Sequence, residues 1–262
     1  MEVHVFVLHL VRASARRDNA QALLADAREI GGMKGQIWPA VDGSAMSATD
    51  LSASVGAALF EPGYPFPLKA GEIGCTLSHR QIWAELQMRD AGAALILEDD
   101  AEIAPDTFEA ALNLASTHID KLGYIQFQTR APKGPSRLVD TSGDCRLVVP
   151  QQAGLRTTGQ MVSRAAAAHL LALSNPFDRP VDTLIQSHWH TGLRPAMIYP
   201  SGLADIGEEL DGSTIQAGDK PWTEKLVRAL HRTRYRAAVA RLSRRSAAPA
   251  RGGFAPKDAH DD

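Results

Sequence analysis

Three consecutive carboxylates, Glu98, Asp99 and Asp100, follow a short apolar run at residues 95–97. Adjacent like charges repel one another, so a fold that keeps them together needs a compensating cation or a changed protonation state. Acids that directly follow a strand often hold Mg²⁺ or Mn²⁺, because these cations prefer oxygen ligands and also bind substrate phosphates. The segment therefore indicates a divalent-metal site, with a solvated acidic turn as the simpler alternative.

Four further side chains are candidates for the same chemistry. His188 and His190 are two residues apart, a spacing that suits one metal only on an extended backbone. His79 follows Ser78 among apolar residues of an expected helix, so it is either a core histidine or a partner of the acids. Asp182 follows a proline-bounded turn, where an acid also favours the first turn of a helix. Each position therefore has both a structural and a chemical interpretation.

Alternating strand and helix patterns predict an α/β fold around these residues. Residues 3–10 have the apolar, β-branched composition of a buried strand, residues 14–30 the spacing of a helix, and residues 36–41 a second strand pattern. A helix over residues 71–90 and a strand over residues 93–97 then lead directly to the acids. This order is typical of an α/β domain with a mainly parallel central sheet.

The elements after the acids are less regular. Between residues 44 and 70 the pattern is weak, and prolines 62, 65 and 67 predict a rim loop or a lid. The other expected elements are strands over residues 124–128, 145–149, 157–163 and 196–199, helices over residues 106–116, 163–173 and 181–189, and a loop over residues 133–143.

Composition indicates an ordinary globular protein. The 262 residues are 44% hydrophobic and 22% charged, with a formal net charge of -2. The two cysteines, Cys75 and Cys145, are far apart, which argues against a disulfide scaffold and fits a reducing cytoplasm. The apolar start has no positive leader and no small-residue cleavage site, and no run is long enough to span a membrane. We therefore expect a cytoplasmic protein.

The C-terminal region is strongly basic. Residues 220–251 contain ten Lys and Arg residues and one acid, Glu224. Residues 216–246 are expected to form a basic amphipathic helix, with an apolar stripe at Trp222, Leu226, Leu230, Ala237 and Leu242. Such a helix binds anionic membrane surfaces, although a solvated terminal helix fits equally well. Nucleic acid is not expected, because aromatic residues are few there and the remaining chain is acidic. Residues 247–262 have a disordered composition.

Three motifs in this order resemble glycosyltransferase family 25, which includes lipooligosaccharide galactosyltransferases and collagen galactosyltransferase domains. They are residues 40–43, residues 71–79 with Trp83, and residues 95–100. Looser similarity continues at residues 158–164 and 180–182, so the resemblance covers roughly residues 3–200. The Ser-His block followed by Glu-Asp-Asp is specific as a pair, whereas either alone is a weak signal.

The resemblance implies a Rossmann-type, GT-A-like nucleotide-binding domain over residues 1–215. Such a domain uses a UDP-sugar and a divalent cation, Mn²⁺ or Mg²⁺, and inverts the anomeric carbon. Asp100 is then the foremost metal ligand, and Asp182 the base that inversion in one displacement requires. Further candidate ligands are Asp99 and His188, Glu98 is a second candidate catalytic residue, and candidate substrate contacts are Asp99, His79, Ser78, Asp42 and Gly43.

The expected reaction is transfer of a hexose, galactose foremost, to a lipopolysaccharide, a lipooligosaccharide or another surface glycan. A lipid-linked acceptor would explain the basic C-terminal helix and would place the protein peripherally on the inner membrane. One alternative is another metal-dependent phosphoryl or nucleotidyl enzyme, which would draw more carboxylates or histidines into a two-metal cluster. The other is a catalytically silent module that binds the nucleotide-sugar without turnover.

Overall fold

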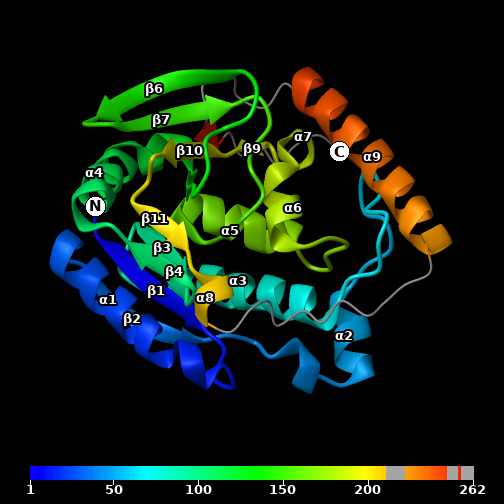
Figure 1. Ribbon diagram of the computed structural model, residues 1–262, viewed down its shortest axis with the longest axis horizontal. Coiled ribbons are helices and arrows are strands. Elements are labelled where there is room, and N and C mark those ends of the chain that lie inside the picture. Colours follow the sequence, from blue (N-terminus) through cyan, green and yellow to red (C-terminus); the bar gives the residue numbers. More distant parts are fainter. Residues whose placement is uncertain (211–221, 247–252, 255–262) are drawn as a thin grey trace.

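A single eight-stranded sheet organises the chain, which this computed structural model describes over residues 1–210, 222–246 and 253–254 (Figure 1). In spatial order the strands are β2 (Lys34–Pro39), β1 (Val3–His9), β3 (Ala93–Glu98), β8 (Gly159–Ser163), β5 (Tyr124–Phe127), β10 (Ala196–Tyr199), β7 (Cys145–Pro150) and β6 (Ser136–Ser142).

The predicted α/β fold is confirmed, and its sheet is mixed. Six of the eight strands run in one direction, and β8 and β7 run against them. Because β8 lies between β3 and β5, and β7 between β10 and β6, three neighbouring pairs are parallel and four are antiparallel. Most strands thus point the same way, as predicted, but most neighbouring pairs are antiparallel.

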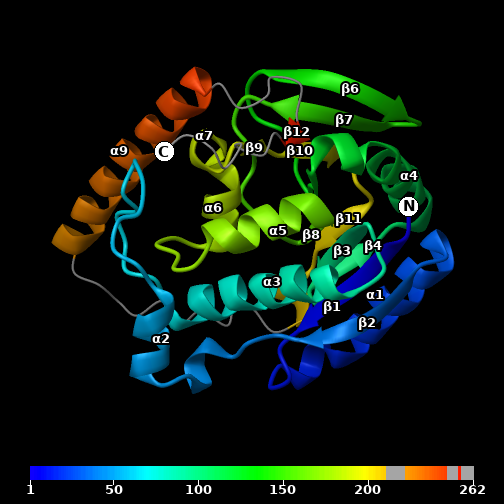
Figure 2. The ribbon, with the colours of Figure 1, turned by 180° about the vertical axis from the view of Figure 1, so that it is seen from behind.

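Helices cover both faces of the sheet, so the central strands are apolar on both sides. On β1, Val5 and Val7 belong to the core that includes α1 (Arg17–Gly31) and α4 (Pro105–Leu122). Phe6 and Leu8 belong instead to the core with α3 (Ala70–Met88) and α5 (Arg164–Leu173), which pack side by side (Figure 2). This double burial explains why the strand at residues 3–10 reads as a continuous apolar run.

Two elements differ from the sequence-based expectation. The loop predicted over residues 133–143 is largely strand β6, which forms a hairpin with β7 around Gly143 and Asp144. Its side chains are mostly exposed on both faces, so no apolar alternation marks it, and Gly143 adopts the positive φ of +55° that such a turn favours. A short helix, α2 (Ala48–Ser54), occupies part of the weakly patterned segment; Ser47 Oγ caps it by accepting from the Asp50 amide at 3.1 Å.

The proline-rich segment is anchored to the body by Arg179, which is fully buried before α6 (Val181–Gln186). Its guanidinium donates to the Phe60 and Pro62 carbonyls at 2.9 and 3.3 Å, and to both carboxylate oxygens of Asp178 at 2.7 and 2.9 Å. It also lies 3.4 Å from the centroid of the Phe60 ring. This buried cation therefore holds the segment in place.

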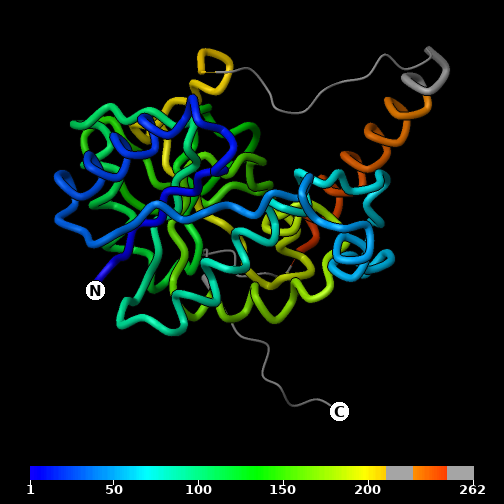
Figure 3. The backbone as a smooth tube through the Cα atoms, turned by 90° about the horizontal axis from the view of Figure 1, so that it is seen from below, coloured from blue at the N-terminus to red at the C-terminus, as the bar shows by residue number. Residues whose placement is uncertain are grey.

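Within the predicted basic helix, residues Trp222–Arg245 form α9, which packs beside α7 (His188–Thr191) (Figure 1) and lies at the edge of the molecule (Figure 3). The face toward the body includes Val239 and Ser243, both buried, whereas Leu230 of the expected apolar stripe is 50% exposed. No helix among the described residues is both long enough and apolar enough to span a membrane.

The three-part division of the chain stays a prediction. Residues 211–221, which contain the expected boundary at residue 215, lie outside the described residues. The same is true of residues 247–252 and 255–262, on which most of the expected disordered tail falls. Gly253–Phe254 forms a short strand, β12, against β9 (Leu193–Arg194).

Candidate active site

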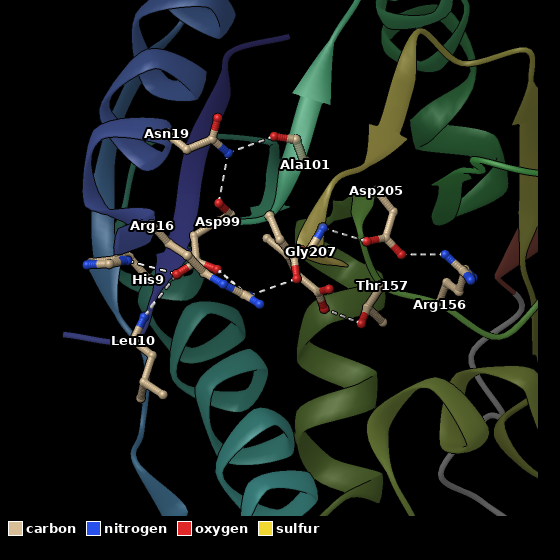
Figure 4. A network of polar contacts seen from close by, with 12 residues as sticks. His9, Leu10, Arg16, Asn19, Asp99, Ala101, Arg156, Thr157, Asp205 and Gly207 are labelled. Carbon is tan, nitrogen blue, oxygen red and sulfur yellow. Dashed lines mark hydrogen bonds and ion pairs between the residues drawn. The ribbon is translucent and has the colours of Figure 1, made fainter. Parts of the chain in front are cut away.

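The three acids lie where β3 ends beside the end of β1, because these strands are parallel and Glu98 is opposite Leu8. Asp99 is buried at 7% exposure, and its carboxylate joins two segments (Figure 4). His9 Nδ1 lies 2.8 Å from Asp99 Oδ2, and Arg16 Nη1 donates to Oδ1 at 3.2 Å. Both oxygens are therefore occupied. Asp99 therefore anchors these two segments, and its metal and substrate contacts stay predictions.

Asp100 contacts the same guanidinium group, that of Arg16, but fewer side chains hold it than hold Asp99. Arg16 Nη1 donates to Asp100 Oδ2 at 2.8 Å, and Asp100 is more exposed than Asp99. Burial raises the pKa of Asp100, the Arg16 charge opposes that rise, and Asp99 and Asp205 add to it. Burial alone would lower the pKa of Arg16, but the two aspartates raise it above its usual value. One arginine thus only partly balances the negative charge here.

Glu98 has the most perturbed carboxyl group of the three. Its Oε1 accepts a hydrogen bond of 2.5 Å from the hydroxyl of Thr157, on the segment that enters β8. Burial and the charge of Asp100 raise the pKa of Glu98 to about 7, although the Thr157 hydrogen bond lowers it. A carboxyl group poised near neutrality can take up or release a proton under ordinary conditions.

Asp182 belongs to the same electrostatic site, so the structure brings it together with Glu98. It lies in the first turn of α6, where its Oδ1 accepts from the Thr183 amide at 2.6 Å and from the Thr183 hydroxyl at 3.1 Å. Burial raises the pKa of Asp182, these bonds and one from the Arg156 amide lower it, and its charge contributes to the raised pKa of Glu98.

Arg156 closes the opposite side of the site. Its Nη1 donates to Asp205 Oδ2 at 2.5 Å, and Asp205 Oδ1 accepts from the Gly207 amide at 3.2 Å (Figure 4). Arg156 has a φ of 102°, the one positive value among described residues other than glycine. Such backbone strain persists where the surroundings hold it, and it is often found at functional sites.

Ser78, in the middle of α3, lies close to the segment of Asp42 and Gly43, and each of the three has contacts within the protein. Ser78 Oγ accepts from the Val41 amide at 2.8 Å and donates to the Gly74 carbonyl at 2.7 Å, and it is 1% exposed. A Cβ at Gly43 would lie 1.8 Å from the Ala70 carbonyl oxygen, so only glycine allows this close approach. Asp42 caps the following turn through Ser44 and pairs with Arg12. Their substrate contacts stay predictions.

The two predicted histidines differ in their surroundings. His188 is fully buried, with Nδ1 3.0 Å from Ser246 Oγ and Nε2 3.2 Å from the Gln151 carbonyl. Burial lowers the pKa of His188 to about 4, and both nitrogens have partners other than the acids, so it is not part of the site proposed below. His79 is also fully buried, with its pKa lowered to about 4 by burial, but it lies beside Glu98 and Cys75.

Several residues of the site were not found from the sequence. Arg16 supplies the compensating positive charge that three adjacent acids require. It lies at the start of a helix 83 residues before Asp99, and no sequence pattern links the two positions. His9 contacts the Asp99 carboxylate, and Asn19 Nδ2 donates to the main-chain carbonyl of Asp99 at 2.8 Å. For His9, its position in the strand is the signal that could have found it, because His9 is the last residue of β1 as Glu98 is the last residue of β3.

Replacing Thr157 by valine tests the electrostatics of Glu98. The hydroxyl stabilises the ionised carboxylate, so its loss is expected to raise the pKa of Glu98 further, by up to about one unit for one hydrogen bond. A ¹³C NMR titration of the glutamate carboxyl groups, with Glu98→Gln to assign the signal, measures the shift. Thr158→Val is the matched control, since Thr158 is the next residue and its side chain makes no hydrogen bond to Glu98. An unchanged titration in Thr157→Val would contradict the assignment.

The family-model comparison covers most of the chain. The model described as glycosyltransferase family 25 (LPS biosynthesis protein) matches residues 2–185, which include β1, α3, the three acids and Asp182. The chain belongs to glycosyltransferase family 25. The family resemblance, predicted from three motifs, is therefore confirmed over the region that contains the three acids and Asp182, whereas Asp205 lies beyond the match.

Known relatives of this family 25 chain include one protein named as a galactosyltransferase and one named as inactive. Procollagen galactosyltransferase 2 of Homo sapiens is 31% identical over 194 residues, which cover 69% of this chain and 29% of the relative. Inactive glycosyltransferase 25 family member 3 of Homo sapiens is 29% identical over 235 residues, covering 83% and 38%. The chain thus spans less than two-fifths of the length of these curated relatives.

A solved glycosyltransferase structure resembles this family 25 chain only distantly. A glycosyltransferase involved in the glycosylation of the major capsid of PBCV-1 aligns with 67% of this chain and 68% of its own, at 12% identity and a TM-score of 0.35. A likeness this remote does not inform the site.

Proposed function

We propose that this chain is a glycosyltransferase that moves a hexose, galactose foremost, from a UDP-sugar to a surface-glycan acceptor with inversion. The observation that carries the proposal is Glu98: a carboxyl group with a pKa of about 7, beside Asp100 and within the field of Asp182. Membership in family 25 supports the sugar-transfer chemistry.

Glu98 is the base in this proposal. It takes the proton from the acceptor hydroxyl as that oxygen attacks the anomeric carbon, and UDP leaves from the opposite face. Asp182 was the base expected from the resemblance, but its Oδ1 already accepts two bonds from Thr183. We therefore assign Asp182 to orienting a substrate hydroxyl, and its rigid position in the first turn of α6 suits that task.

A divalent cation fits the acidic side of the site. Glu98 and Asp100 both have a raised pKa, first because they are buried and then because other carboxylates lie close by; at Asp100 the charge of Arg16 only partly offsets this. Asp100 would hold Mn²⁺ or Mg²⁺, with Asp205 as a further oxygen donor. When bound, the metal would neutralise charge on the diphosphate leaving group. Arg16 and Arg156 would keep the surrounding aspartates oriented.

Thermal unfolding with UDP and Mn²⁺ tests the donor and the metal together. Ligand at 100 times its Kd is expected to stabilise the fold by about 2.7 kcal/mol, and so to raise Tm. Asp100→Asn should abolish the Mn²⁺-dependent part of this shift. Asp140→Asn, at an exposed acid paired with His118, is the control and should keep it. If UDP with Mn²⁺ leaves Tm of the native chain unchanged, the proposal fails.

A silent nucleotide-sugar-binding module is the second candidate, because a relative at 29% identity is named inactive. That module would show the Tm shift with UDP but no hydrolysis or transfer from any UDP-sugar. A panel of UDP-galactose, UDP-glucose and their N-acetylated forms, assayed for UDP release, separates the two candidates and identifies the donor. The phosphoryl-enzyme alternative gains no support, since the one compact His, Cys, Asp and Glu group among the described residues contains a single carboxylate.

The acceptor proposed here is a lipid-linked glycan on the inner face of a membrane, with α9 as the contact. Val227 and Leu230 are about half exposed, and Arg234 and Arg241 follow Val227 at intervals of seven residues, which places them on the same outward face.

Co-sedimentation with vesicles tests this contact. Anionic vesicles should bind the chain and neutral vesicles should not. Removing two basic residues by Arg234→Gln and Arg241→Gln should weaken binding by about 2 kcal/mol, roughly 30-fold. Equal binding to neutral vesicles, or no effect of the double substitution, would contradict the proposed role of α9.

A further inference from the structure

Glu98 also belongs to a partly buried cluster with Cys75 and His79, of which the proposed mechanism uses only Glu98. Cys75, His79 and Glu98 each offer one ligand atom, and these atoms all lie within 4.8 Å of one another. Cys75 and His79 are four residues apart on α3, so they share one helix face. Glu98 reaches them from the end of β3. Two helical ligands and a third from a strand are therefore brought together by the fold.

Unpartnered polar atoms indicate that this cluster is incomplete. His79 is fully buried and Gln160 is 1% exposed, yet among the described residues neither His79 Nδ1 nor Gln160 Oε1 has a hydrogen-bond partner. The amide nitrogen of Gln160 lies 3.0 Å from His79 Nε2 and donates to it. An orphaned imidazole nitrogen inside a protein costs free energy unless something binds it. A cation between the three side chains would use it.

We propose that Cys75, His79 and Glu98 form a binding site for a thiophilic divalent cation of the zinc class, distinct from the oxygen-ligand metal at Asp100. A thiolate, an imidazole and a carboxylate are the ligand types that zinc prefers, whereas Mg²⁺ and Mn²⁺ favour oxygen. A fourth position stays open to water. Ligand bonds of about 2.0–2.3 Å require the three atoms to approach to about 3.5 Å, a small side-chain movement from the present spacing.

Binding displaces protons in a defined way. The Cys75 thiol gives up its proton to solvent as sulfur joins the metal, and any proton on Glu98 leaves in the same way. The imidazole stays neutral: its proton moves from Nδ1 to Nε2, and the Gln160 amide turns over so that Oε1 accepts from it. Gln160 would then be a positioning residue, orienting the ring as hydrogen-bonded neighbours of metal-binding histidines commonly do.

Occupation of this site would withdraw Glu98 from its role as base, so zinc-class metals would inhibit transfer. That consequence rests on the proposed function, whereas binding itself does not. The approach is open, since Cys75 and Glu98 are each partly exposed at the rim of the cluster. Zinc-class metals would therefore bind at this site without displacing Mg²⁺ or Mn²⁺ from Asp100.

Titration of the full chain with Co²⁺ reads out the site directly, without any activity measurement. The expected result is one equivalent bound, with tetrahedral d–d bands and a thiolate-to-cobalt charge-transfer band, both displaced by Zn²⁺. Cys75→Ser should remove the charge-transfer band, and Gln160→Leu should weaken binding by roughly 10- to 100-fold. Cys145→Ser is the matched control, because it removes the other free thiol, and it should change nothing.

The opposite outcomes are equally clear. Absence of a charge-transfer band in the native chain, or a band that survives Cys75→Ser and disappears in Cys145→Ser, would overturn the site. A thermal unfolding curve for each variant shows that the protein is folded. Loss of Co²⁺ binding with a normal UDP response would count against this inference alone, and the reverse against the proposed function alone.

Discussion

Replacing Glu98 by glutamine is expected to lower kcat for sugar transfer by about 10²- to 10⁴-fold, the usual contribution of a general base. The amide keeps the shape of the side chain and can still contact Thr157, so the fold is retained. It cannot accept a proton from the acceptor hydroxyl at any pH. Because Asp100 is untouched, the Tm shift with UDP and Mn²⁺ should remain. Steady-state transfer assays and thermal unfolding measure the two effects.

Two variants make this experiment decisive. Glu102→Gln is the matched control, since Glu102 is an exposed glutamate on the next strand, β4 (Ala101–Ile103), and it should transfer at the native rate. Asp182→Asn should raise KM more than it lowers kcat, as loss of an orienting contact would. If Asp182→Asn abolishes kcat while Glu98→Gln is nearly active, the base is Asp182 as the family resemblance implied.

Replacing Arg179 by leucine is expected to lower the free energy of unfolding by about 3–5 kcal/mol, the cost of removing one partner from a buried ion pair. The substitution strands the Asp178 carboxylate at 8% exposure and leaves the Phe60 and Pro62 carbonyls without their donor. Urea unfolding monitored by tryptophan fluorescence measures the change, and activity should fall only as the folded fraction falls.

An exposed pair of similar length provides the contrast. Arg12 donates to Asp42 at 2.7 Å, as Arg179 does to Asp178, but the Arg12 side chain is 52% exposed. Arg12→Leu should therefore cost only about 0–1 kcal/mol. The double variant Asp178→Leu/Arg179→Leu should recover part of the stability lost in Arg179→Leu, because no charge is then left unpaired. Equal losses from Arg12→Leu and Arg179→Leu would refute burial as the cause.

Sequence patterns were sufficient where one local signal decides the outcome. The strand at residues 3–10 and the helix at residues 71–90 are confirmed as β1 and α3, because apolar composition and periodicity persist over two or more turns or a full strand. The acids were placed correctly at a strand end for the same reason. Strand β6 escaped detection because exposure on both faces leaves no periodicity.

Neighbouring residues of one type show what sequence could not decide. Asp99 and Asp100 have the same side chain, yet Asp99 is enclosed by His9 and Arg16 whereas the Asp100 carboxylate contacts Arg16 and is more exposed. The difference arises from contacts with segments 80 to 90 residues away, which no local pattern encodes. The antiparallel placement of β8 between β3 and β5 is likewise a long-range result.

Arg179 also constrains how the chain can be shortened for structural or industrial use. Besides its bonds to the proline-rich segment, its Nη1 lies 3.5 Å from the hydroxyl of Tyr235, whose ring packs edge-on against Tyr64. A version trimmed before α9 would open this fully buried guanidinium to water on one side and remove Tyr235 from Tyr64. We therefore expect a chain trimmed before α9 to be less stable than the full chain, so trimming for expression should begin beyond residue 246.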